Sequence, residues 1–252
     1  MLFPSIVYGP VHSRRLGLSL GMNLMPVTAK LCTFDCIYCE CGFNTPVTHP
    51  ELPSRQSVKE ALENCLRTME QQPDVITFSG NGEPTLHPDF AGIIDDTLAL
   101  RDRYCRHAQV CVLSNSTQLG REEVVQALRK VDQRILKLDS ALDRTMRMID
   151  CPVNADLTVE QIVSRLETFG GDFTLQTCFL RGTRNGETID NTTEHELQAW
   201  YRIVERLRPK KIMIYVIDRA TPVKTLEKID RARMEAIAAP LQDKGYDIEI
   251  SA

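Results

Sequence analysis

The chain has 252 residues, 42% of them hydrophobic, so it is long enough to bury a sizeable core as one large α/β domain or two small ones. Thirty basic and 34 acidic residues give a net charge of −4 without a long run of like charge, which argues against a protein built mainly to hold nucleic acid. The N-terminus has no basic segment followed by an apolar one, and no stretch approaches the ~18 apolar residues of a membrane span. These features predict a soluble, cytoplasmic protein.

Short apolar runs that are typical of strands alternate along the chain with helix-length amphipathic segments. The expected strands are 18–25, 75–78, 109–113, 134–138, 173–180 and 211–217. The expected helices between them are 57–70, 89–102, 120–129, 157–168 and 193–206, and a further helix over 229–241 and a short strand over 246–250 follow. Ser57 with Glu60, and Thr193 with Glu196, have the spacing of a capping box.

Strands that alternate with helices indicate βαβ units and a parallel sheet. Eight such units usually need about 250 residues, but roughly the first 17 and last 30 residues here lie outside the six-strand repeat. We therefore expect a partial (β/α)6 TIM-like barrel, with an open doubly wound sheet as the alternative. No linker divides the chain, so we expect one domain over 1–252, with its core at about 18–220 and short N- and C-terminal extensions.

Nine cysteines in a chain without a secretion signal are better interpreted as thiols than as a disulfide framework. Cys32, Cys36, Cys39 and Cys41 lie within ten residues, and the first three have C-x3-C-x2-C spacing. Soft thiolates select zinc, copper(I) or iron-sulfur clusters. Three ligands leave one metal position open for a reactant, which favours a catalytic [4Fe-4S] site. A fourth thiolate from Cys41 is the alternative, because it closes the site into a structural centre.

A second motif follows the strand expected at 75–78. The chain runs there into Gly80-Asn81-Gly82-Glu83-Pro84. Glycines at the end of a strand let a ligand lie against bare backbone, where carbonyl groups accept hydrogen bonds from an ammonium group, and Glu83 adds a charge for it. An ordinary tight turn is the alternative, since Asn-Gly is a favoured turn dipeptide.

Polar side chains on the expected strands suggest further ligand contacts. Lys137 and Asp139 share one face of their strand, with leucines on the other, so both charges are expected near the C-terminal mouth of the barrel. Asn115 follows the third strand, and Gln176 lies on the fifth. The alternatives are a mutual ion pair for the two charges and hydrogen bonds within the core for the two amides.

The two motifs together resemble those of the radical S-adenosylmethionine (SAM) superfamily, in which C-x3-C-x2-C holds a [4Fe-4S] cluster and the residue before the third cysteine is aromatic, here Tyr38. Asn81 replaces the first glycine of the family's Gly-Gly-Glu-Pro motif, and asparagine tolerates positive φ. More closely, residues 9–15 (GPVHSRR) and 77–85 (TFSGNGEPT) look like those of small wybutosine-synthesis-like iron-sulfur oxidoreductases.

The resemblance implies that Cys32, Cys36 and Cys39 ligate three irons and that the amine and carboxylate of S-adenosylmethionine chelate the fourth. One electron from the cluster, supplied by a donor such as flavodoxin or ferredoxin, then releases a 5′-deoxyadenosyl radical that abstracts a substrate hydrogen. By the same resemblance, the cofactor is expected to contact Gly80 to Glu83, with its ammonium group at Gly82 and Glu83 and its adenine beside Tyr38. Cys41 is expected to be a bystander.

Two arginines suggest the substrate class. Arg181 and Arg219 follow the fifth and sixth strands, so their guanidinium groups are expected at the C-terminal mouth, where they suit a small anionic substrate. The alternative is a pair of solvated rim arginines, one of them bridged to Asp218 or Glu187.

The basic residues Arg14 and Arg15 and the run 208–211 are expected at the opposite, N-terminal face, so no tight tRNA binding is expected. Two other functions stay open at this point. One is a glycyl-radical-type activating enzyme that acts on a protein partner, and the other is a non-catalytic metal-binding module.

Overall fold

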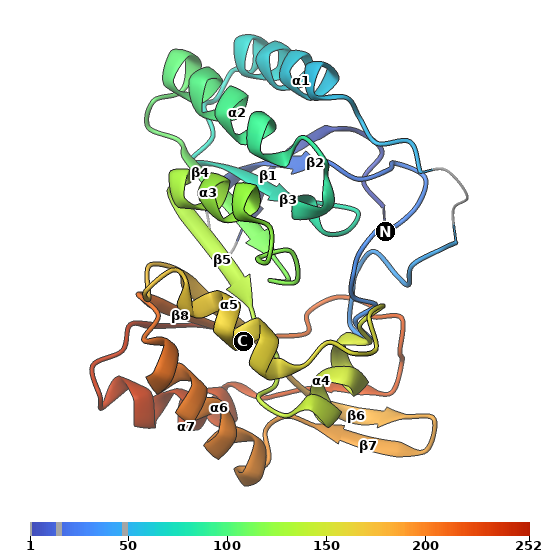
Figure 1. The fold of residues 1–252 in the computed structure, drawn as a ribbon, viewed down its shortest axis with the longest axis vertical. Coiled ribbons are helices and arrows are strands. Elements are labelled where there is room, and N and C mark those ends of the chain that lie inside the picture. Colours follow the sequence, from blue (N-terminus) through green and yellow to red (C-terminus); the bar gives the residue numbers. More distant parts are fainter. Residues whose placement is uncertain (1, 14–16, 47–49) are drawn as a thin grey trace. The chain divides into compact units, whose positions relative to one another are not determined.

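The computed structural model describes residues 2–13, 17–46 and 50–252. The chain divides into two compact units (Figure 1). The first unit holds the chain up to Cys32 together with Asn44–Ile135, and the second holds Thr33–Phe43 together with Leu136–Ala252. Strand β5 (Gln133–Lys137) carries the chain from the first unit into the second.

The first unit is a sheet covered by helices. Its strands are β1 (Val7–Ser13), β2 (Gly17–Asn23), β3 (Val75–Ser79) and β4 (Gln109–Ser114), and its helices are α1 (Arg55–Thr68), α2 (Phe90–Tyr104) and α3 (Glu122–Lys130). β1 is antiparallel to β2, whereas β2, β3 and β4 are parallel, with Leu20 opposite Ile76 and Ile76 opposite Val110. The consecutive residues Val75 to Phe78 of β3 are all buried, so both faces of this strand are covered, as is typical of a parallel strand.

The second unit is built in the same way, from parallel strands covered by helices. Its strands are β6 (Thr174–Arg184), β7 (Glu187–Asp190), β8 (Lys211–Val216), β9 (Leu226–Lys228) and β10 (Ile248–Ser251), and its helices are α4 (Asp143–Asp150), α5 (Val159–Glu167), α6 (Glu194–Leu207) and α7 (Arg231–Gln242). β6, β8 and β10 are parallel neighbours. The C-terminal half of β6 extends beyond this sheet and pairs with β7 and β9, both antiparallel to it.

The helix caps show where the sequence patterns were right and where they were not. Thr193 caps α6 as expected, accepting a hydrogen bond from the N–H of Glu196. The capping box expected at Ser57 and Glu60 is wrong, because Ser54 is the cap of α1 and its hydroxyl accepts from the N–H of Ser57 at 3.1 Å. Helix α1 therefore starts one residue beyond Ser54.

The six expected strands are found as β2 to β6 and β8, and the helices expected between them are α1, α2, α3, α5 and α6, with α7 and β10 at the C-terminal end. Three strands and one α-helix were not expected: β1, α4, β7 and β9. Gly9 and Pro10 interrupt the alternation of apolar and polar residues in β1. Helix α4 and strands β7 and β9 are too short to show a clear hydrophobic period.

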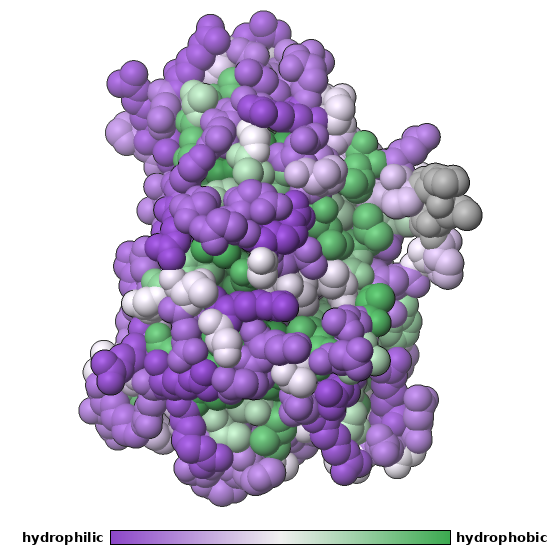
Figure 2. Space-filling model, in the orientation of Figure 1, coloured by the Kyte–Doolittle hydropathy of each residue, from purple (hydrophilic) through white to green (hydrophobic). Residues whose placement is uncertain are grey.

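The outer faces of the helices are polar. On the face drawn in Figure 2, hydrophilic side chains cover most of α1 and α2. Among the described residues, no helix combines the length and the apolar composition needed to cross a bilayer.

Candidate active site

The first cysteine of the C-x3-C-x2-C motif is tied to the Gly80–Pro84 loop within the first unit. Leu31, which precedes Cys32, forms a parallel bridge with Gly82. The Leu31 N–H donates to the Asn81 carbonyl at 2.9 Å, and the Glu83 N–H donates to the Leu31 carbonyl at 3.1 Å. The start of the cysteine motif therefore lies next to the Gly80–Pro84 loop, about 50 residues further along the sequence.

Gly82 makes this close approach possible. Its φ is +151°, and a Cβ atom built on it would lie 1.7 Å from the Leu31 carbonyl oxygen. A side chain at this position cannot coexist with the Leu31–Gly82 bridge, so glycine is required by the backbone contact itself.

Asn81 does not have the positive φ that its place in the motif suggested, and its side chain has a structural role instead. Gly80 and Gly82 have positive φ, but Asn81 between them does not. Its fully buried amide instead accepts from the N–H of Phe3 at 2.7 Å and donates to the carbonyls of Phe3 and Pro26, both at 2.9 Å. Asn81 thus fastens the loop to the N-terminal segment.

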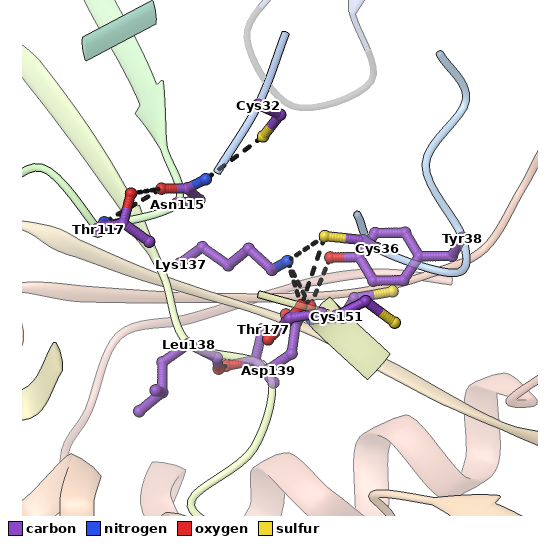
Figure 3. A network of polar contacts seen from close by, with 12 residues as sticks. Cys32, Cys36, Tyr38, Asn115, Thr117, Lys137, Leu138, Asp139, Cys151 and Thr177 are labelled. Atoms are coloured by element: carbon purple, nitrogen blue, oxygen red, sulfur yellow. Dashed lines mark hydrogen bonds and ion pairs between the residues drawn. The ribbon is translucent and has the colours of Figure 1, made fainter. Parts of the chain in front are cut away.

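Asn115, at the end of β4, reaches the sulfur of Cys32. Its Nδ2 lies 3.4 Å from the Cys32 Sγ, and its Oδ1 accepts hydrogen bonds from the N–H and the hydroxyl of Thr117, which fixes the orientation of the amide (Figure 3). An amide donor held against a sulfur stabilises the thiolate form that a metal or cluster requires.

Glu83 is buried and links the ends of β3 and β4. Its Oε1 accepts from the hydroxyl groups of Thr85 and Ser114, at 2.5 and 2.9 Å, and its Oε2 accepts from the N–H of Asn115 at 2.7 Å. Burial raises the pKa of the Glu83 carboxyl, although these donors oppose the shift. The carboxylate therefore holds the loop and Asn115 in place from within the unit.

Within the second unit, Lys137 at the end of β5 faces the sulfur of Cys36. The Lys137 Nζ lies 2.9 Å from the Cys36 Sγ, 2.5 Å from Asp150 Oδ1 and 3.1 Å from Asp139 Oδ2 (Figure 3). The mutual Lys137–Asp139 ion pair, which the sequence left as the alternative to a ligand contact, is thus present, and Asp150 forms a second ion pair with the same lysine. Nζ also lies about 5 Å from the centres of the Phe34 and Tyr38 rings.

The two carboxylates hold Lys137 in its charged form. Burial opposes the charge on Lys137, but Asp139 and Asp150 outweigh it and hold the lysine pKa well above its usual value. Burial raises the pKa of Asp150 to about 7 in spite of Lys137. The ammonium group is therefore a permanent positive charge beside Cys36.

Tyr38, the aromatic residue before Cys39, is held by its hydroxyl. The phenol donates to Asp139 Oδ2 at 2.5 Å, and Asp139 Oδ1 accepts from the N–H of Cys178 at 2.8 Å. Burial, followed by the charge of Asp139, raises the pKa of the phenol well above its usual value. Tyr38 therefore stays protonated and anchored to the sheet.

The other residues of the cysteine loop follow a tight turn. The Cys39 N–H donates to the Cys36 carbonyl at 3.1 Å, and the Gly42 N–H donates to the Cys39 carbonyl at 2.9 Å. Cys41 lies within this turn and is partly buried. Among the described residues, no three His, Cys, Asp or Glu side chains are grouped closely enough to hold a single metal ion.

The remaining predicted residues that the structure describes have other partners, and only Arg219 among them contacts the cysteine loop, through Glu40. Gln176 is buried on β6 and donates to the Met213 sulfur at 3.5 Å. Arg181 pairs with Glu227 at 2.7 Å and Arg219 pairs with Glu40 at 2.6 Å, all four with well-exposed side chains. These carboxylates are not the partners the sequence suggested. Arg14 and Arg15 lie outside the described residues.

Sequence reasoning missed Asp150. It ends the unexpected helix α4, and the following Cys151 adopts a left-handed conformation that terminates the helix. Nothing in the local sequence distinguishes this aspartate from the many acidic residues on helix surfaces, so its approach to Lys137 could be found only from the tertiary structure.

A model of the Radical SAM superfamily matches residues 27–195, and the chain belongs to this superfamily. Among its relatives, the UPF0026 protein slr1464 of Synechocystis sp. is 30% identical over 96% of this chain and 85% of its own length. The GTPase Obg of Brachyspira hyodysenteriae is 29% identical over 91% of this chain, which spans 32% of that protein.

Solved structures show the same fold. Streptococcus suis SuiB bound to S-adenosylmethionine has a TM-score of 0.64 and 11% identity, over 89% of this chain and 48% of SuiB. TYW1 with a lysine-pyruvate adduct bound has a TM-score of 0.64 and 15% identity, over 89% of this chain and 73% of TYW1. The expected fold class, a partial α/β barrel with a mostly parallel sheet, is confirmed, and so are the family and its enzymatic nature. Membership of the family implies S-adenosylmethionine and an iron-sulfur cluster as cofactors.

Proposed function

We propose that the protein is a radical SAM enzyme in which Cys32, Cys36 and Cys39 hold a [4Fe-4S] cluster. When bound, the cluster supplies the electron that cleaves S-adenosylmethionine to methionine and a 5′-deoxyadenosyl radical, which abstracts hydrogen from the substrate. Three thiol ligands leave the fourth iron for the amine and carboxylate of S-adenosylmethionine.

The observation that carries this proposal is the bridge between Leu31 and Gly82. It brings Cys32, the first proposed ligand, next to the loop that resembles the family's S-adenosylmethionine motif. Two of the three proposed ligand thiols have a donor that suits a cluster ligand, since Asn115 donates to the Cys32 sulfur and Lys137 donates to the Cys36 sulfur. Donors of this kind stabilise thiolate ligands and influence the reduction potential of a cluster.

The proposed contacts to S-adenosylmethionine follow from the same residues. Backbone carbonyls between Gly80 and Glu83 receive its ammonium group, and Glu83 holds that loop to Asn115. Tyr38, anchored by Asp139, lies beside the adenine, and Lys137 and Gln176 complete the set. In this role, Asp139 acts by fixing the positions of Lys137 and Tyr38.

The substrate is proposed to be a small anionic molecule, and the electron donor a flavodoxin or ferredoxin. A protein substrate of the kind used by glycyl-radical activating enzymes stays the alternative. The chain's own contribution to the chemistry is to position the reactants and to exclude water from them.

The experiment is anaerobic reconstitution followed by iron analysis and a cleavage assay. We expect about four irons per chain. Replacement of Cys32, Cys36 or Cys39 by alanine abolishes formation of 5′-deoxyadenosine, whereas Cys41→Ala, the matched control from the same loop, retains it. Loss of the iron in Cys41→Ala as well would favour a closed, four-thiolate centre and contradict the proposal.

A further inference from the structure

A pocket of about 520 Å³ lies within the second unit, at the end of the β6–β7 hairpin. Its walls include Thr183 and Arg184 from β6, Phe43 from the end of the cysteine loop, and Val223 and Thr225 from the segment before β9. None of the residues predicted from the sequence to bind cofactor or substrate lines this pocket.

Arg184 is the charged group of the pocket. This half-buried guanidinium donates to the Cys151 Sγ at 2.6 Å, and its Cζ lies 5.6 Å from the centre of the Phe43 ring. Within the part of the chain that is described, it forms no ion pair with a carboxylate.

The charged residues next to Arg184 on the hairpin, in contrast, form ion pairs. Arg181, three residues earlier on the same strand, is paired with Glu227. Glu187, the register partner of Arg184 across the hairpin, pairs with Arg144 at 3.6 Å. Because its positive charge is not neutralised by an acid and a guanidinium carries five N–H donors, Arg184 is suited to bind an anion.

The hairpin fixes the backbone at Arg184. Asn185 and Gly186 connect β6 to β7 with φ values of +52° and +80°, both positive as in a type I′ turn, the two-residue connection that fits the twist of paired strands. The arginine is thus the last residue of a strand before a tight turn, which limits the conformational freedom lost when a ligand binds.

The pocket is connected to the cysteine loop. The Val223 N–H donates to the carbonyl of Ile37, the residue between Cys36 and Tyr38, at 3.3 Å. Ile37 is fully buried in an apolar cluster with Leu180 of β6, against which Val223 also packs. A molecule in the pocket therefore lies in the same packed unit as two of the proposed cluster ligands.

From these contacts we infer that the pocket binds the anionic group of a small organic substrate through Arg184, with the apolar part of that molecule against Phe43 and Val223. Phe43 is 39% exposed, and its ring offers an apolar surface beside the guanidinium. This inference rests on the proposed function and replaces Arg181 and Arg219 by Arg184 as the substrate arginine.

The test is a titration of the anaerobically reconstituted protein with benzoate, followed by ligand-observed NMR. Inorganic phosphate and neutral benzamide are titrated in parallel. We expect benzoate to bind, benzamide not to bind, and Arg184→Gln to weaken benzoate at least tenfold, because a charge-assisted hydrogen bond is lost. If phosphate binds more tightly than benzoate in an Arg184-dependent way, the anion is a phosphate.

Two control variants locate the site. Arg206→Gln removes an arginine of the same unit that is paired with Glu160 and Glu167, and it should change benzoate affinity less than twofold. Arg181→Gln tests the smaller neighbouring pocket, of about 280 Å³, that Arg181 lines. An equal loss in Arg181→Gln, or none in Arg184→Gln, overturns the inference, as does the absence of benzoate and phosphate binding.

A measurement on the unaltered chain keeps the test valid if Arg184→Gln fails to fold. Benzoate should protect Arg184 from phenylglyoxal, as read by peptide mass spectrometry, and leave Arg206 unprotected. Equal protection of both contradicts the inference. If iron binding and S-adenosylmethionine cleavage fail but benzoate still binds in an Arg184-dependent way, the proposed function is refuted and the anion site remains. If iron binding and cleavage succeed but benzoate does not bind, only the anion site is refuted.

Discussion

The Nζ of Lys137 lies 2.9 Å from the Sγ of Cys36, so a buried ammonium group faces one of the proposed cluster thiols. Asp139 and Asp150 hold the lysine from the other side. Burial of three charges costs free energy unless each is paired, and here the lysine is the partner of both carboxylates.

We therefore predict that Lys137→Met destabilises the fold, because two buried carboxylates lose their counter-charge. The expected loss in the free energy of unfolding is about 3–5 kcal/mol, measured by urea denaturation of the cluster-free protein. Lys211→Met is the matched control, since Lys211 pairs with Glu249 near the surface and should cost at most about 1 kcal/mol. Equal losses in the free energy of unfolding in the two variants would mean that the buried Lys137 ion pairs stabilise the fold no more than a surface ion pair does.

Gly82→Ala should disrupt the approach of Leu31 to the loop after β3. The added Cβ would meet the Leu31 carbonyl oxygen at 1.7 Å, so the bridge has to break. We expect loss of iron binding and a marked fall in stability. Gly245→Ala is the control, because Gly245 also has positive φ but has nothing within 4 Å of an added Cβ, and should cost only about 1–2 kcal/mol. Normal iron content in Gly82→Ala would show that the bridge does not position Cys32.

The buried carboxyl of Glu83 predicts a pH dependence of stability. Its pKa in the folded protein is raised, so as pH rises above about 4.3 the unfolded chain releases this proton before the folded one does. The contribution of this group to stability is therefore present at low pH and falls as pH rises through its folded pKa. Urea denaturation at a series of pH values should show Glu83→Gln gaining stability relative to the unaltered protein as pH rises. A constant difference would mean that the folded pKa is not raised.

Glu83 also has a consequence for the cofactor. Glu83→Ala should weaken S-adenosylmethionine binding about tenfold or more, since it removes the carboxylate that holds the loop to Asn115. The dissociation constant is measured by equilibrium dialysis on protein whose iron content is shown to be unchanged. An unaltered constant would make Gly80 to Pro84 a simple turn.

Tight tRNA binding is not expected. The chain has a net charge of −4. The basic run 208–211 stands at the N-terminal end of β8, whereas the expected chemistry belongs to the C-terminal ends of the strands. We predict no sub-micromolar complex at physiological salt in a filter-binding assay. A tight complex whose affinity falls steeply with salt would contradict this.

The sequence predicted the parallel strands well because strands buried on both faces are continuous apolar runs. Such runs can be recognised from the local sequence without knowledge of distant contacts. It placed Lys137 next to Asp139 for the same reason, since strand geometry sets which residues share a face. Asp150 and Arg184 could not be predicted, because their partners are 13 and 33 residues away and only the tertiary structure brings them together. Arg219 follows β8 as expected, but Arg181 lies within β6, which extends to Arg184 because its second half pairs with β7 and β9. The ion pairs of both arginines depend on Glu227 and Glu40, which no local pattern indicates.

The most direct test of the proposed function is the electron paramagnetic resonance spectrum of the reduced, reconstituted protein, recorded with and without S-adenosylmethionine. If Cys32, Cys36 and Cys39 leave one iron for the cofactor, the spectrum of the [4Fe-4S] cluster changes when S-adenosylmethionine is added, and 5′-deoxyadenosine then accumulates. A cluster spectrum that S-adenosylmethionine leaves unchanged, with no 5′-deoxyadenosine formed, would contradict the account.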